Sequence, residues 1–471
     1  MVEELNKIKK IFNKKILLSL LFLIIIIIGF IIYPQINQEA RVVKTSDMII
    51  PAYNHEMVLT KGKVLKIGYD SYESVIKYLK EVGIGNIPEF NQKTITFDGK
   101  SYKIGPENYD WLNILLHDDS NFKDKSKFKK YINKYKKDYP YDVAYAELYD
   151  PKSDKYSFLG IFGNARPKLL PDTSIIALKN GNVLITGGTV NMAPLKDAIM
   201  YDATKKTFIK VSDMNFRRSD HTSIVLNDGR VLITGGKTCD VKRYSRNCHV
   251  LNNAEIFDPK TSTFTLLDNK MKSARRYHNM ITLKNGKVLI TGGADGRGYD
   301  SPTHGYTNTA EIFDPNTNTF TSINLLKTTR EYRHPKSVLL SDGKVLFAGG
   351  WIIGEKVGST RCRSTVEVFD PETNQFNIIG KLKEYRCNPQ LAVLSNNKVL
   401  VYASDYKYGK KSMEIYDLNK NTTTSYYILN GYPTGDQSNL IRINQGIALI
   451  TGGTFYGEGR RNSKLVILKD K

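Results

Sequence analysis

The chain has 471 residues, with 69 lysines and arginines against 47 aspartates and glutamates, which gives a formal net charge of +22. Hydrophobic residues make up 41% of the sequence and charged residues 25%, a globular composition that excludes wholesale disorder. Its 35 glycines, 16 prolines and 4 cysteines are too few for a collagen-like chain or a small disulfide-rich scaffold.

An uninterrupted apolar segment lies near the N-terminus. Residues 16–33 carry no charged side chain, and at about 1.5 Å per residue they nearly span a bilayer core of about 30 Å. Residues 1–15 are basic, which predicts a cytoplasmic tail, a single-pass transmembrane signal-anchor over 16–33 and an extracytoplasmic remainder. A cleaved signal peptide and a buried core helix are the alternative interpretations.

Two further segments precede the clearest repeats. The stretch AELYDPKSDKY, which contains Asp150, is similar to the second half of a later repeat, and HEMVLTKGKVLKIG over residues 55–68 is similar to a degraded first half. Residues 69–142 between them predict an α+β insertion, with an amphipathic helix near its start and a hairpin around Asp98 and Gly99.

A repeated motif follows from residue 171 onward. The copies LKNGNVLITGG, LNDGRVLITGG, LKNGKVLITGG and LSDGKVLFAGG end at Gly188, Gly236, Gly293 and Gly350. Each is followed by a segment such as AEIFDP and then an aromatic residue, so that one unit spans roughly 50 to 57 residues. Asn-Gly or Asp-Gly between apolar runs is a strong hairpin signal, and each unit therefore predicts four short antiparallel strands.

These units resemble the kelch repeat, and in particular the kelch-like propeller of the galactose oxidase group. The shared features are the double glycine, the AEIFDP strand and the later aromatic residue, which is Phe here instead of the usual Trp. The resemblance covers residues 171–471 and implies an all-β propeller of radially stacked sheets. The paired glycines are expected where the backbone passes so close to an adjacent blade that a Cβ would not fit.

The number of blades depends on how the Asp150 segment pairs. We predict a propeller over residues 41–471 with seven blades, the first of which is formed by residues 55–68 and the Asp150 segment. The alternative has six blades, in which the Asp150 segment pairs with the C-terminal strands and residues 41–140 form a separate domain.

The four cysteines are compatible with an oxidising exterior. Cys239 and Cys248 lie in one loop and are predicted to form a disulfide, whereas Cys362 and Cys387 are either bridged or free. No CxxC motif occurs in the sequence, so a zinc ribbon or a thioredoxin-like site is not supported.

The segments that enter the first strands and leave the second strands should emerge on one face, because neighbouring strands run antiparallel. They are rich in arginine, whose planar fork of donors suits carboxylate, sulfate or phosphate, and in tyrosine, which offers a stacking surface. We predict that this face binds an anionic glycan or a protein partner without a cofactor. The candidate ligand-binding residues are Arg217, Arg218, Arg275, Arg276, Tyr277, Arg330, Tyr332, Arg333, Tyr385 and Arg386. For each arginine the alternative is a structural role in holding neighbouring blades through backbone carbonyls.

The resemblance to the galactose oxidase group implies an alternative function, a carbohydrate-active copper-radical oxidase. It would require a Tyr–Cys crosslink, a second tyrosine and two histidines. His221, His278 and His334 occupy nearly equivalent repeat positions, where we expect them to be structural. No GxSxG, HExxH or Walker A motif is evident, so we expect a binding module more than an enzyme. The external location makes nucleic acid an unexpected partner despite the positive charge.

Overall fold

The computed structural model describes most of the repeat region and parts of the N-terminal half. The described residues are 41–44, 54–71, 93–97, 100–104, 142–161, 172–190, 193–242, 245–296, 307–324, 337–353, 360–386, 389–395, 397–404, 411–427, 439–444, 447–451, 454–455, 458–459 and 463–467. Every regular element within these ranges is a β-strand, so the search there finds no helix that could cross a membrane. The predicted anchor over 16–33 lies outside these ranges, as do the predicted helices of the insertion.

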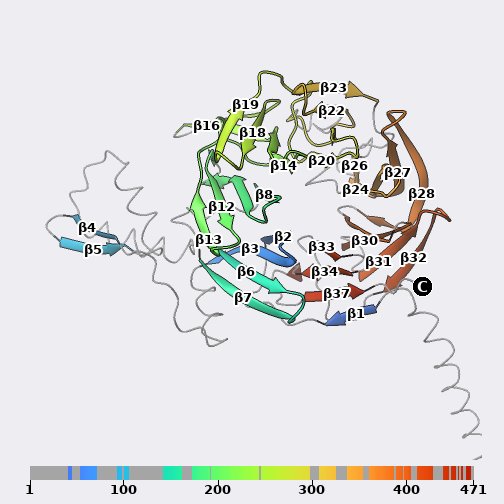
Figure 1. Cartoon of the computed structure of the whole chain (residues 1–471), viewed down its shortest axis with the longest axis horizontal. Coiled ribbons are helices and arrows are strands. Elements are labelled where there is room, and N and C mark those ends of the chain that lie inside the picture. Colours follow the sequence, from blue (N-terminus) through green and yellow to red (C-terminus); the bar gives the residue numbers. More distant parts are fainter. Residues whose placement is uncertain are drawn as a thin grey trace, which may run out of the picture.

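Antiparallel sheets follow one another around a ring (Figure 1). The first contains β2 (Asn54–Thr60), β3 (Lys63–Ser71), β6 (Asp142–Asp150) and β7 (Lys155–Ile161). The second contains β8 (Thr173–Ala177), β9 (Val183–Gly187), β12 (Ala198–Asp202) and β13 (Thr207–Lys210). The third contains β14 (Thr222–Val225), β15 (Val231–Thr234), β18 (Ala254–Asp258) and β19 (Thr263–Leu266), and the fourth β20 (Asn279–Thr282), β21 (Val288–Thr291), β22 (Ala310–Asp314) and β23 (Thr319–Ile323).

The remaining sheets come from the C-terminal part of the chain. One contains β24 (Ser337–Leu339), β25 (Val345–Ala348), β27 (Thr360–Asp370) and β28 (Gln375–Arg386), with β26 (Trp351–Ile353) as a fifth strand that pairs with the start of β27. The next contains β29 (Gln390–Ser395), β30 (Lys398–Ser404), β31 (Lys411–Asp417) and β32 (Thr422–Tyr427). The last contains β33 (Asn439–Asn444), β34 (Ile447–Thr451), β37 (Ser463–Ile467) and β1 (Arg41–Lys44).

The first strands of the sheets form the inner wall of the ring. In chain order, β2, β8, β14, β20, β24, β29 and β33 each contact the next, and β33 contacts β2. The segment with Asp150 pairs with β3 and not with the C-terminal strands, whereas β1 supplies the outer strand of the last sheet. The described part of the ring therefore has six sheets of four strands and one of five.

Short hairpins extend from this framework. They pair β10 (Thr189–Val190) with β11 (Ala193–Pro194), β16 (Lys237–Lys242) with β17 (Ser245–Val250), and β35 (Thr454–Phe455) with β36 (Glu458–Gly459). The predicted hairpin around Asp98 and Gly99 is confirmed by the pairing of β4 (Lys93–Phe97) with β5 (Lys100–Ile104).

Apolar packing between consecutive sheets provides the core. Leu232 and Ile256 of the third sheet share one cluster with Val288, Ile290 and Phe313 of the fourth. Both faces of an inner sheet are covered by neighbours, which explains why every residue of β15 and of β21 is buried.

The double glycines lie where consecutive sheets approach most closely. A Cβ on Gly187 would lie 2.3 Å from the carbonyl oxygen of Arg218, and one on Gly235 would lie 2.2 Å from that of Arg275. Both glycines also have positive φ, 63° and 61° respectively. The prediction that these positions exclude a side chain is confirmed.

The aromatic residue of the fourth strand packs on the aromatic residue of the third strand. Phe257 and Phe264 are directly opposite in register with ring centroids 4.8 Å apart, and Phe313 and Phe320 repeat the same distance. Such cross-strand aromatic pairs stabilise the sheet, and the Phe that stands here in place of the usual Trp forms this pair.

Candidate ligand site at the centre of the ring

The residues just before the first strands link neighbouring sheets near the centre of the ring. The backbone N–H of Asp220 donates to the carbonyl oxygen of Asp172 at 3.0 Å, and that of Tyr277 donates to the carbonyl oxygen of Asp220 at 2.9 Å. Asp220 and Tyr277 both adopt the left-handed backbone conformation, with φ of 59° and 55°. This repeated geometry brings equivalent residues of three consecutive sheets together.

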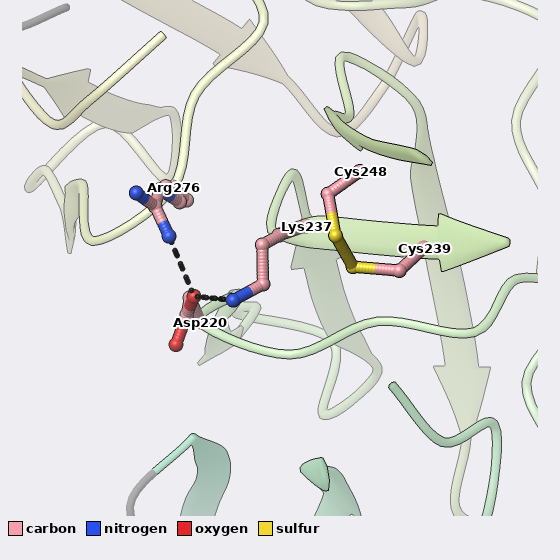
Figure 2. The surroundings of a disulfide bond; sticks show 5 residues. All are labelled: Asp220, Lys237, Cys239, Cys248 and Arg276. Atoms are coloured by element: carbon pink, nitrogen blue, oxygen red, sulfur yellow. Dashed lines mark hydrogen bonds and ion pairs between the residues drawn. A yellow bond between two sulfur atoms is a disulfide. The ribbon is translucent and has the colours of Figure 1, made fainter. Parts of the chain in front are cut away.

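Six residues form what we call the axial cluster: Asp172, Thr189, Asp220, Lys237, Arg276 and Tyr277. Oδ2 of Asp220 lies 3.2 Å from Nη1 of Arg276 and 3.4 Å from Nζ of Lys237. Figure 2 shows the Asp220 carboxylate between these two cations, with Lys237 at the base of a disulfide-linked hairpin.

The rest of the axial cluster adds an acceptor and an aromatic face. The Thr189 hydroxyl donates to Oδ2 of Asp172 at 2.8 Å. The Arg276 guanidinium lies over the Tyr277 ring, 5.0 Å from its centroid, in a cation–π contact. The cluster thus offers carboxylates, cations and a ring within one small area.

Asp220 is unusual among these groups because its side chain is fully buried. Burial raises the pKa of Asp220 above its ordinary value, and the Asp172 carboxylate raises it further, whereas Lys237 and Arg276 lower it. Its Oδ1 atom is buried and has no hydrogen-bond partner in the described part of the chain. The cations, in contrast, are each about a quarter exposed, so solvent reaches them but not the carboxyl.

Three predicted ligand-binding arginines are not available to a ligand. Arg218, Arg275 and Arg386 are completely buried and form ion pairs with Glu255 at 2.6 Å, Glu311 at 2.7 Å and Glu414 at 2.9 Å. Burial lowers the pKa of Arg218 and of Arg275, and the glutamates partly offset this effect. Their assignment as ligand contacts must therefore be corrected to the structural alternative.

Hydrogen bonds to backbone carbonyls also hold the side chains of these buried arginines inside the protein. Nη1 of Arg218 donates to the carbonyl oxygen of Gly235 at 2.7 Å, and Nη1 of Arg275 donates to that of Gly292 at 2.9 Å. These carbonyls belong to the double-glycine segments of the sheet that each arginine enters. A guanidinium can satisfy a carboxylate and a carbonyl at once, which a lysine cannot do with the same geometry.

The buried glutamates have a role that the sequence interpretation missed. Glu255 accepts hydrogen bonds from the backbone N–H groups of Asn215 at 2.7 Å and Phe216 at 3.0 Å, so it fixes the segment that leads into β14. Glu311 does the same for Lys272 and Ser273. The signal was the repeated Glu in AEIFD, a charged residue in a strand that is otherwise apolar.

The other predicted residues have different surroundings. Arg276 and Tyr277 lie together in the axial cluster. Arg217 and Tyr385 are exposed, the latter to 66%, and no described contact joins them to the axial cluster. Arg330, Tyr332 and Arg333 lie outside the described residues.

The described histidines of the repeat connect neighbouring sheets. Nε2 of His221 is 2.8 Å from the Thr186 hydroxyl oxygen, and Nε2 of His278 is 2.7 Å from that of Thr234, each in the preceding sheet. Both imidazoles are completely buried. This is the structural role expected for them, and His334 lies outside the described residues.

The cysteines of the described residues are in disulfides. Cys239 and Cys248 face each other in the β16–β17 hairpin and are bonded. Cys362 is also disulfide-bonded, and Cys387 lies outside the described residues.

These findings bear on the copper-radical alternative. A disulfide-bonded sulfur has no thiol with which to crosslink a tyrosine, and Cys239, Cys248 and Cys362 are all disulfide-bonded. None of the three cysteines among the described residues therefore fits the Tyr–Cys crosslink that a copper-radical site requires.

Comparison with known proteins shows which proteins this chain resembles. No protein-family model matches the chain. Two curated relatives from Gibberella zeae, both named galactose oxidase, are 27% and 30% identical to it over 225 residues, which is 45% of this chain. The matched segment covers 28% of the length of each relative.

A solved structure is similar over a longer range. It is a fungal alcohol oxidase of the AA5 family in complex with copper, and the similarity covers 92% of this chain and 77% of that one. The TM-score is 0.58 and the identity 14%, so this likeness concerns the fold. Together with the ring of sheets, these comparisons show a galactose-oxidase-like propeller.

Proposed function

We propose that this propeller recognises a carbohydrate at the axial cluster. The observation that carries the proposal is the Asp220 carboxyl held between Lys237 and Arg276, beside Tyr277. Sugar hydroxyls both donate and accept hydrogen bonds, so a mixed set of carboxyl and cationic groups suits them, and an aromatic ring suits the apolar face of a sugar. The relatives' name, galactose oxidase, points to the same class of ligand.

Binding is tested with the purified full chain and a panel of neutral and acidic oligosaccharides. We expect at least one sugar to bind, and Arg276→Gln to weaken that binding at least tenfold. Arg217→Gln is the matched control, because Arg217 is an exposed arginine of an equivalent entry segment. Equal binding by wild type and Arg276→Gln would contradict the location of the site.

A second candidate is oxidation of a carbohydrate alcohol. The comparisons favour this activity over a module that only binds, because both curated relatives are named as oxidases. Cys239, Cys248 and Cys362 are disulfide-bonded and so are not available for the Tyr–Cys crosslink of such a site. Copper analysis of the purified chain, together with oxygen consumption in the presence of galactose, distinguishes the two candidates: stoichiometric copper with turnover supports the oxidase, and sugar binding without either supports the binding module.

We also propose that the ring has seven blades and lies outside the cytoplasm. The five-stranded sheet counts as a blade because β24, β25, β27 and β28 repeat the order of the other sheets. The disulfide in the β16–β17 hairpin supports an oxidising compartment. If external protease did not reach the ring in intact cells, the proposed location would be contradicted. If alkaline carbonate extracted the chain from membranes, the predicted membrane anchor over residues 16–33 would be contradicted.

A further inference from the structure

In the axial cluster, the carboxylate of Asp220 is already paired with both cations, Lys237 and Arg276. Nζ of Lys237 and Nη1 of Arg276 both approach the same oxygen, Oδ2 of Asp220. A ligand carboxylate that takes the N–H donors now directed at Oδ2 must therefore compete with Asp220 for them.

The arrangement of exposure makes that displacement possible from the solvent side. The side chain of Asp220 is 0% exposed, while those of Lys237 and Arg276 are 26% and 28% exposed. A ligand that arrives from solvent can therefore contact the cations before the buried carboxyl. It can contact both cations without moving the backbone that holds Asp220, which is fixed by its hydrogen bonds to Asp172 and Tyr277.

Loss of its two cations would leave Asp220 buried and charged, which is strongly unfavourable. Among the described residues, the charged groups that face Asp220 are Asp172 from the second sheet, Lys237 from β16 and Arg276 from the segment before β20. With the cations engaged elsewhere, Asp172 remains, and its carboxylate is placed to accept a hydrogen bond from a protonated Asp220. The Thr189 hydroxyl supports Asp172 in the role of acceptor by donating to Oδ2.

We propose that Asp220 is a built-in competitor for the acidic group of the ligand, and that binding of an acidic sugar is coupled to uptake of one proton at Asp220. This inference rests on the proposed function, and it narrows the ligand to a saccharide that carries a carboxylate. The charges balance: two carboxylates and two cations are neutral before binding, and the ligand's negative charge is matched by the added proton afterwards. Burial already favours the neutral form of Asp220 and raises its pKa, so this uptake costs less than at an exposed aspartate.

The experiment is titration calorimetry of the full chain with galacturonic acid trimer, with galactotriose as the neutral control. Titrations are made at several pH values between neutral and mildly acidic, in two buffers with different ionisation enthalpies. For the wild type we expect an apparent binding enthalpy that depends on the buffer, and an affinity for the acidic trimer that rises by up to about tenfold for each unit by which pH falls. Galactotriose should show neither effect.

Asp220→Asn provides the decisive variant, because it keeps the shape of the side chain and removes both the charge and the titration. We expect it to bind the acidic trimer more tightly than wild type at neutral pH, with no dependence on buffer and with the pH slope lost. Asp213→Asn is the matched control, since Asp213 pairs with Lys196 and Lys210, neither of which belongs to the axial cluster. It should behave as wild type.

The outcomes distinguish the competitor role of Asp220 from carbohydrate binding at the axial cluster. Tight binding of the acidic trimer without proton uptake, or an unchanged pH slope in Asp220→Asn, overturns the competitor role and leaves the proposed site intact. Binding of galactotriose alone overturns the acidic-sugar inference and keeps carbohydrate recognition. If Asp220→Asn does not fold, the buffer dependence of the wild type decides the question by itself. Failure of both trimers to bind overturns the present inference.

Discussion

The first sheet and the third and fourth sheets solve the same electrostatic problem in different ways. Each contains a buried glutamate in its third strand, three residues before the aspartate that ends the strand, and each must provide a cation for it. In the first sheet, Lys66 of β3 lies directly opposite Glu147 in register, with 3.3 Å between Nζ and Oε2. In the third and fourth sheets, Ile233 and Ile290 occupy that position of the second strand, and the cation is an arginine from the preceding segment.

This difference shows what the arginine adds. A cross-strand lysine joins two strands that are already paired by backbone hydrogen bonds. An arginine from the preceding segment fixes the chain that leads into the innermost strand, and Arg218 and Arg275 lie only two residues and one residue before Asp220 and Arg276. In the third and in the fourth sheet, the Arg–Glu ion pair therefore has two roles: it stabilises the ring, and it positions the neighbouring residues of the axial cluster.

The largest effect is expected when the cation of one of these buried ion pairs is removed. Arg275→Met leaves Glu311 charged and buried, and we expect a loss of about 3–5 kcal/mol in the free energy of unfolding, measured in urea. Lys66→Met should be similarly destabilising because Glu147 is equally buried. Only Arg275→Met should also weaken ligand binding at the axial cluster, since Arg276 is adjacent. Arg217→Met, at an exposed position, should change stability by less than about 0.5 kcal/mol.

A second test concerns the glycines at the contact between the third and fourth sheets. Gly235→Ala places a methyl group against the Arg275 carbonyl in a left-handed backbone, and we expect a loss of about 2–4 kcal/mol. Gly62 of the first sheet is the control, because its φ is also positive but nothing lies within 4 Å of the added Cβ. Gly62→Ala should cost only about 1 kcal/mol in thermal or chemical unfolding. Equal losses would mean that backbone conformation, and not contact between sheets, requires the glycine.

The double variant Arg218→Met with Glu255→Leu tests the glutamate's second role. Replacing both members of a buried ion pair by apolar residues is often neutral or stabilising. Here the backbone N–H groups of Asn215 and Phe216 would lose their acceptor, so we expect a remaining loss of about 2 kcal/mol in chemical unfolding. Full recovery of stability would show that the glutamate serves the arginine alone.

The smallest expected effect concerns pH. Because the folded-state pKa of Asp220 is raised, its ionised form destabilises the fold at neutral pH, and this penalty is relieved as pH falls through the folded pKa toward the unfolded value. Asp220→Asn should be as stable as the wild type or slightly more so at neutral pH, with the difference shrinking on acidification. The melting temperatures of both proteins between pH 7 and pH 4 measure this, and a difference that grows in acid would contradict the assigned direction.

Much of the fold could be read from the chain because repetition multiplies a weak local signal. One Asn-Gly turn followed by VLITGG suggests a hairpin, and its recurrence with AEIFD suggests radially packed sheets. The contribution of β1 to the last sheet was not predicted, because RVVK carries no repeat motif and its partner lies more than 400 residues away. Long-range pairing of a short strand leaves no local pattern.

The candidate site was predicted less well than the fold. Spacing indicated that the segments before the first strands share one face, and Arg276 and Tyr277 do lie in the axial cluster. Spacing could not show that Arg218, Arg275 and Arg386 turn inward, because the direction of a side chain depends on a glutamate in another strand. Asp220 was overlooked because an aspartate before a histidine has no distinctive local signature.

The amino-acid sequence by itself determined the repeated four-stranded unit, the glycines at the contacts between sheets and the hairpin cysteines, since each depends on neighbouring residues or on a recurring motif. Only the tertiary structure decided which charges are buried and which remain accessible, because a guanidinium or carboxylate is stabilised by the groups packed around it. Those groups come from different sheets, and their distances are set when the ring closes.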